Sequence, residues 1–103
     1  MDKGDAINIA SQYAHALKAR YDNIKVILFG SYAKGTFHDD SDIDIAVILK
    51  DYKNLLDIQR DLMRLRRRID SRIEPHPFRE NEFELTNPIV NEIVKHGQEI
   101  HVA

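Results

Sequence analysis

Two apolar segments rich in β-branched residues constrain the fold of this chain more than any other feature. IKVILFG occupies residues 24–30 and stops at a glycine, and DIDIAVIL occupies residues 42–49. Runs of this length bounded by turn signals are typical of buried β-strands. The second run begins with alternating aspartate and isoleucine, so we expect its isoleucines to face the core and its acids the opposite face. Because only residues 31–41 separate the runs, we expect the end of the first to lie near the start of the second.

Three further segments have the spacing of amphipathic helices. Residues 5–20 carry an apolar stripe at intervals of three and four, and Asp5 is the expected cap. Residues 53–69 repeat these intervals most regularly in the chain. Residues 87–97 run from an Asn-Pro helix start to a glycine, which is a common helix end.

Shorter elements complete the prediction. SYAKG at residues 31–35 reads as one helical turn between a serine cap and a glycine terminator. SRIEPHPF at residues 71–78 is a short third strand at best, because its two prolines confine it to a sheet edge. EIHV at residues 99–102 is a candidate final strand.

This order of elements predicts an α/β (α+β) domain in which helices pack on a small mixed β-sheet. The length of 103 residues suits one domain, 1–103, with an open cleft rather than a large enclosed pocket. The net charge of -2 gives no global basic field, so we expect no direct nucleic-acid binding. The chain has no cysteine, which excludes disulfides and thiolate metal sites. No leader or membrane span is recognisable, so we expect a cytoplasmic protein without membrane contact.

Asp42 and Asp44 open the second predicted strand. Residues two apart on a strand point to the same face and lie about 6–7 Å apart. Mg²⁺ typically takes one or two carboxylates together with water and substrate phosphates, so the pair is a candidate metal site. The alternative is that both acids simply face water, which is common for an isolated Asp-x-Asp triplet.

Gly30 and Ser31 directly follow the first predicted strand. A glycine allows a ligand to approach the backbone closely, and the free N–H groups of a following helical turn can bind an anion. Lys34 could add positive charge one turn later. Taken alone, the segment is more often an ordinary strand-to-helix turn with a cap. A phosphate-binding turn beside a pair of metal-binding acids, however, is what phosphoryl or nucleotidyl transfer requires.

The two motifs, Gly30-Ser31 and Ser41-Asp42-Ile43-Asp44, resemble the paired signature of the DNA polymerase beta-type nucleotidyltransferase superfamily. The short chain is similar to the minimal nucleotidyltransferase (MNT) branch, whose members serve as antitoxins in HEPN/MNT modules. The resemblance spans roughly residues 5–78. It implies the polymerase beta-type nucleotidyltransferase fold and a third carboxylate on a neighbouring strand. Glu74 matches that position, although aspartate is commoner there and an ordinary exposed acid is the alternative.

The resemblance also implies a mechanism. ATP would be the substrate, with Gly30, Ser31 and Lys34 binding its phosphates. Asp42, Asp44 and Glu74 would be the catalytic residues and the ligands of two Mg²⁺ ions. Glu74 would bind the second ion or help to deprotonate an attacking hydroxyl. AMP would pass to that hydroxyl as pyrophosphate leaves.

The resemblance further implies a protein acceptor, since larger relatives carry an acceptor-binding domain for which this chain ends too soon. We expect a tyrosine of a HEPN toxin partner to receive AMP within a hetero-oligomer. One alternative is a non-catalytic antitoxin that silences its partner by occlusion, and another is transfer to a small molecule such as an antibiotic. The basic run at residues 64–68 is expected to be a solvated helix end. His76 is the one histidine with a candidate role, because it shares a strand face with Glu74.

Overall fold

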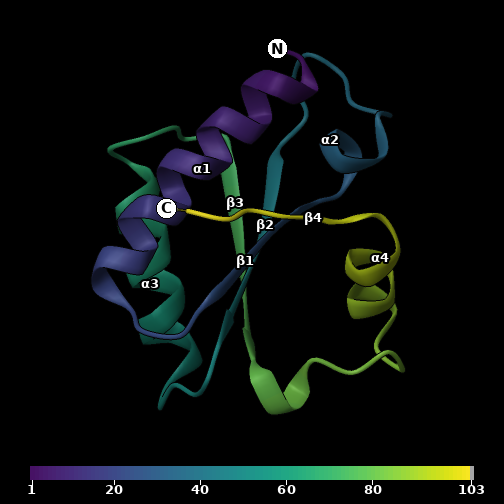
Figure 1. Ribbon diagram of the computed structural model, residues 1–103. Helices are drawn as coiled ribbons and strands as arrows, with labels where there is room; N and C mark the ends of the chain where they lie inside the picture. Colours follow the sequence, from purple (N-terminus) through teal and green to yellow (C-terminus); the bar gives the residue numbers. More distant parts are fainter. Residues whose placement is uncertain (103) are drawn as a thin grey trace.

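The computed structural model describes residues 1–102 and confirms the α/β architecture. Helices and strands alternate along the chain (Figure 1). The elements are α1 (Lys3–Arg20), β1 (Lys25–Phe29), α2 (Ser31–Lys34), β2 (Ile43–Leu49), α3 (Leu55–Arg66), β3 (Ile73–Arg79), a 3-10 turn (Glu80–Glu82), α4 (Pro88–His96) and β4 (Gln98–Glu99).

The four strands form one mixed sheet in the order β3-β2-β1-β4. β1 pairs antiparallel with both β2 and β4, and β2 pairs parallel with β3. The parallel pair needs a crossover, and α3 supplies it. Since β1 and β2 are antiparallel, the end of β1 and the start of β2 lie at the same end of the sheet, as the short connection predicts. The two sequence motifs therefore lie together.

Helices cover both faces of the sheet (Figure 1). On one face, Ile43, Ile45 and Val47 of β2 pack in the main core with α1 and α3. On the other face, Ala46 and Ile48 join a second, smaller core against α4, which contributes Ile93. The distal half of β2 is therefore buried on both faces, as the fully apolar end of its sequence predicts. The opposite face is also buried there, and it becomes polar only at Asp44.

β3 lies at the sheet edge, as its prolines predict, but it is a full seven-residue strand rather than a short one. The ladder explains why the prolines are tolerated. Ile43 N–H donates to the carbonyl of Arg72, so the even-numbered residues of β3 bond to β2. The backbone groups of Pro75 and Pro77 consequently face away from β2. Neither proline removes a hydrogen bond from the sheet.

Capping explains where the helices differ from the sequence prediction. α1 begins two residues earlier than expected, because Asp2 is its N-cap and Asp5 completes a capping box from the third helical position. α3 is shorter than residues 53–69, since Asn54 caps it and residues 67–69 form a turn. α4 follows the prediction, with Asn87 as N-cap, proline at its start and Gly97 at its end.

The strand boundaries shift by small amounts. β1 and β2 are one or two residues shorter than the apolar runs, so Gly30 and Asp42 lie just outside them. β4 comprises only Gln98–Glu99 rather than residues 99–102. Ile100 still donates its N–H to the carbonyl of Val26, and its side chain is buried in the main core.

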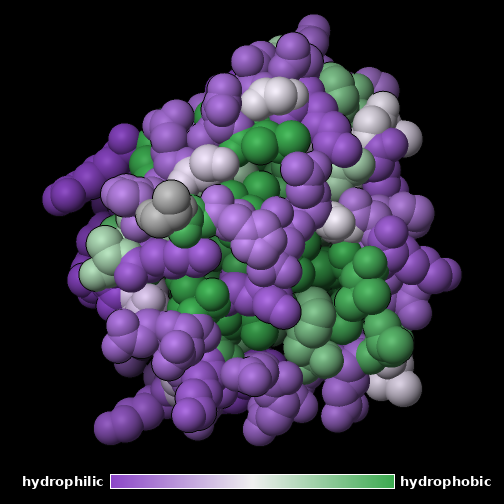
Figure 2. All heavy atoms as spheres, viewed as in Figure 1, coloured by the Kyte–Doolittle hydropathy of each residue, from purple (hydrophilic) through white to green (hydrophobic). Residues whose placement is uncertain are grey.

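Two further features concern the helices. The buried hydroxyl of Tyr13 on α1 donates to the carbonyl of Leu62 on α3 at 2.7 Å and joins the two helices. Apolar side chains are exposed over α4 (Figure 2), where Ile89 and Val94 are about half exposed. None of the helices within residues 1–102 is long and apolar enough to cross a membrane.

Candidate active site

The turn after β1 begins at Gly30, in a backbone conformation that favours glycine. Its φ of 74° and ψ of -152° lie outside the regions that L-residues readily adopt. Gly30 is the N-cap of α2, and its carbonyl accepts the first helical hydrogen bond from Lys34 N–H. Ser31 is thus the first helical residue and not the cap, which corrects the sequence prediction. Gly35 ends the turn in the left-handed conformation, as predicted.

Gly30 also makes a close approach to Asp44. A Cβ at Gly30 would overlap Oδ2 of Asp44 and lie 3.1 Å from its Cγ. Phe29, the preceding residue, is the register partner of Asp44 across the β1–β2 pair. The glycine-serine turn and the acidic strand are therefore in direct contact, which is the juxtaposition that the sequence predicts.

Asp44 and Glu74 are register partners across the parallel β2–β3 pair. Neighbouring strands lie about 4.8 Å apart, so the two side chains project side by side from the same face. Both residues are partly buried. Asp42 is exposed and lies one residue before β2. Alternation along the chain therefore puts it on the same face as Asp44, nearer the end of the sheet. The structure brings the three predicted acids to one corner of the sheet.

His76 contacts Asp44 directly, which sequence reasoning missed. Its Nε2 lies 3.1 Å from Oδ1 of Asp44, and its ring packs edge-on against Phe29 with centroids 5.0 Å apart. The sequence placed His76 on the face of Glu74 but could not show the reach to Asp44. That reach depends on the β2–β3 register, which pairs His76 with the small side chain of Ala46.

Lys34 of α2 pairs with an acid of α4 in this structure. Its Nζ forms an ion pair with Oε1 of Glu92 on α4 at 2.6 Å. Both side chains are a little over one-third exposed, so the pair contributes at most about 1 kcal/mol to stability. Such a weak pair leaves Lys34 available to an anionic ligand at little cost. The pair also shows that α4 lies beside the turn.

The acids fit a metal ion that a ligand helps to bind. Within residues 1–102, no three His, Asp or Glu side chains are gathered so as to hold a metal ion by themselves. Mg²⁺ in nucleotide sites, however, usually takes one or two carboxylates and completes its shell with water and phosphate oxygens. Asp44 and Glu74, with oxygen donors on adjacent strands, match that donor set.

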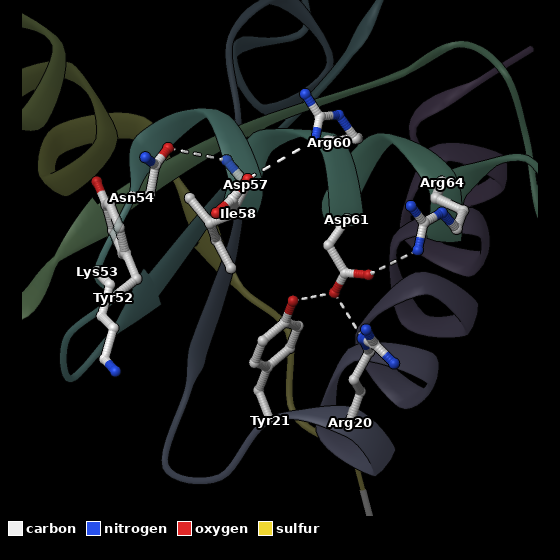
Figure 3. Close-up of a pocket in the computed structure, with 10 residues that line it drawn as sticks. All are labelled: Arg20, Tyr21, Tyr52, Lys53, Asn54, Asp57, Ile58, Arg60, Asp61 and Arg64. Atoms are coloured by element: carbon white, nitrogen blue, oxygen red, sulfur yellow. Dashed lines mark hydrogen bonds and ion pairs between the residues drawn. The ribbon is translucent and has the colours of Figure 1, made fainter.

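A separate pocket lies at the opposite end of β1 and β2 (Figure 3). Arg20, Tyr21 and Arg64 converge there on Asp61, whose side chain is only 12% exposed. Burial alone would raise the pKa of Asp61, but hydrogen bonds from Arg20 and Tyr21 outweigh burial and hold the pKa below its usual value. Burial first, and then the bond to Asp61, raise the pKa of the Tyr21 hydroxyl. These groups satisfy one another, so the cluster is structural.

Comparison with protein families gives one match over most of the chain. Residues 10–100 match the family described as the nucleotidyltransferase domain. The matched segment contains the Gly30 turn, the acids of β2 and β3, and α4.

Curated relatives come from the archaeon Methanocaldococcus jannaschii and are named as candidate protein adenylyltransferases. One is 46% identical over 39 residues, which cover 36% of this chain and 39% of the relative. The chain thus matches well under half of that relative's length. Another is 29% identical over 79 residues, which cover 74% of this chain and 77% of the relative.

Solved structures share the fold. A candidate nucleotidyltransferase from Sulfolobus solfataricus superposes with a TM-score of 0.71 at 23% identity, over 94% of this chain and 80% of the other. A toxin–antitoxin complex with AMP-PNP contains a chain that superposes with a TM-score of 0.68 at 25% identity, over 90% and 73%. A complex of a tri-AMPylated HEPN toxin from Shewanella oneidensis with an MNT antitoxin gives a TM-score of 0.64 at 20% identity, over 98% and 73%.

Proposed function

The chain belongs to the nucleotidyltransferase domain family, and from that premise we propose that it transfers AMP from ATP to a hydroxyl group of a partner protein. The observation that carries the proposal is the contact of the Gly30 turn with Asp44, beside Glu74. The N–H groups of such a turn can bind phosphate, and the adjacent carboxylates can bind the cation that accompanies ATP.

The proposed roles follow from position. Gly30 and Ser31 bind the triphosphate through the backbone, and Lys34 contributes charge when it leaves Glu92. The proposed ligands of Mg²⁺ are Asp42, Asp44 and Glu74. The mechanism requires two such ions. When bound, the metal stabilises negative charge on the reacting phosphate and the leaving group.

The transfer balances as a displacement at phosphorus. The acceptor oxygen forms a bond to the α-phosphorus, and the bond between the α-phosphorus and the bridging oxygen breaks. Pyrophosphate leaves with the electron pair of that bond. The proposed role of Glu74, which borders the site from β3, is to bind the second ion or to accept the hydroxyl proton.

We propose a tyrosine of a HEPN-type toxin as the acceptor, with the chain acting as its antitoxin in a hetero-oligomer. Two complexes with the same fold support a protein partner, one described with AMP-PNP and one with an AMPylated HEPN toxin. The exposed Ile89 and Val94 on α4 offer apolar surface for a partner near the site, since Lys34 of the turn reaches Glu92 of α4.

The test is transfer of label from ATP to the partner. The chain is incubated with Mg²⁺, α-labelled ATP and a HEPN protein encoded by an adjacent gene, and the labelled residue is found by mass spectrometry. We expect AMP on a tyrosine of the partner. Asp44→Asn should reduce the rate on the order of a hundredfold or more, because it removes a metal ligand.

The same experiment separates catalysis from occlusion. If Asp44→Asn silences the partner as well as the original chain does, and neither labels it, the chain acts by binding alone. The enzymatic proposal is then overturned.

A further inference from the structure

The carboxylate of Asp44 is held from two sides. Oδ1 is 3.1 Å from Nε2 of His76, and Oδ2 lies on the side of Gly30, where a Cβ would overlap it. A carboxylate oxygen can only accept, so Nε2 of His76 is the donor of this bond when Asp44 is ionised. The contact leaves Oδ2 turned towards the glycine-serine turn.

The surroundings of His76 keep its ring in this position. The ring packs edge-on against Phe29, and its register partner is the fully buried Ala46. A larger side chain at position 46 would occupy the space through which the imidazole leans towards Asp44. The His76 side chain is about one-third exposed and the Asp44 side chain about one-quarter, so water competes only partly for this hydrogen bond.

We propose that His76 is a positioning residue, which orients Asp44 so that Oδ2 faces the metal and phosphate site. The inference rests on the proposed function, because it assigns Asp44 as a metal ligand. A hydrogen bond to the outer oxygen of a ligating carboxylate fixes its orientation, and losing such a partner typically weakens metal binding by about 10- to 100-fold. His76 lies outside the two sequence motifs, Gly30-Ser31 and Ser41-Asp42-Ile43-Asp44.

The test measures metal affinity directly, without an acceptor. Mn²⁺ is titrated into the chain with an equimolar non-hydrolysable ATP analogue. Because the analogue also chelates Mn²⁺ in solution, protein-bound Mn²⁺ is followed by its enhancement of water-proton relaxation, against a titration without protein. The variants are His76→Gln and His76→Asn, which differ by one methylene. Only the longer glutamine amide can reach Oδ1 of Asp44 from the position of Nε2. His76→Phe keeps an aromatic ring against Phe29 but donates no hydrogen bond.

We expect His76→Asn and His76→Phe to weaken Mn²⁺ binding by about 10- to 100-fold, and His76→Gln to bind nearly as the original chain does. Thermal unfolding should give similar midpoints for the glutamine and asparagine variants, which shows that folding is not the cause. The inference is overturned if the His76→Asn and His76→Gln variants bind Mn²⁺ equally well. It is also overturned if the His76→Phe variant binds Mn²⁺ as tightly as the original chain does.

The outcomes also distinguish this inference from the proposed function. Failure of the original chain to bind Mn²⁺ with the nucleotide analogue overturns the proposed function and the inference together. Normal binding by the original chain and by all three variants overturns the inference alone.

Discussion

At the scale of single residues, Gly30 is a position in the candidate site that tolerates little change. Gly30→Ala would place a methyl group against Oδ2 of Asp44 at a φ of 74°. We expect a loss of about 1–3 kcal/mol in the free energy of unfolding from backbone strain, together with loss of nucleotide-dependent Mn²⁺ binding because the carboxylate is displaced. Urea unfolding and the metal titration measure the two effects.

Gly35→Ala is the matched control. Gly35 also has a positive φ, of 81°, but a Cβ there meets no atom within 4 Å. We expect about 1–2 kcal/mol of strain and unchanged metal binding. Equal loss of binding in both variants would contradict a specific role for the Gly30–Asp44 contact.

Sequence reasoning reached the principal acids of the site but not the side chain that orients one of them. Asp42 and Asp44 follow from alternation along a single strand, and Gly30 from its place after another. The contact between His76 and Asp44 connects two neighbouring strands, β3 and β2, which the crossover helix α3 separates along the chain. Its geometry depends on a register that no local pattern encodes. The metal-binding and catalytic roles of these residues stay predictions.

At the scale of elements, caps decide where the helices begin. The Asn54 side chain accepts hydrogen bonds from the N–H groups of Leu56 and Asp57 at the start of α3. We expect Asn54→Ala to lower the free energy of unfolding by about 0.5–2 kcal/mol, measured by urea denaturation. Asn54→Ser keeps a capping oxygen and should recover most of the loss. A serine variant as unstable as the alanine variant would argue against capping as the cause.

The element boundaries show what local patterns can and cannot predict. The Asn-Pro start and glycine end of α4 are local signals, and the prediction from them is confirmed. The start of α1 was missed because Asp2 and Asp5 are both good caps, and only their reciprocal bonds select Asp2. β3 extends further than its prolines suggested, since their outward orientation follows from the pairing with β2.

At the scale of the whole molecule, stability should depend on acid pH through Asp61 and Asp70. Hydrogen bonds from Arg20 and Tyr21 outweigh burial and lower the pKa of Asp61, and the hydrogen bond from Arg72 lowers that of Asp70. The unfolded chain therefore binds more protons than the folded one at acid pH. The stabilisation is present above about pH 4 and is lost as the pH falls through the lowered pKa values.

Urea unfolding at pH 7 and at pH 3 tests this dependence. We expect the original chain to lose more stability between the two pH values than the double variant Asp61→Asn/Asp70→Asn. The amide side chains do not titrate, so their hydrogen bonds persist in acid. Equal losses would show that other carboxylates control acid unfolding.

The outer side of β3 has a consequence for how copies of this chain can associate. Arg66 donates to the carbonyl of Ile73 and Gln59 to that of Pro75, while the nitrogens of Pro75 and Pro77 carry no hydrogen. A strand from another molecule would find few free donors or acceptors along this side. Polymerisation by strand addition is therefore blocked at β3, even when the protein is crowded at high concentration.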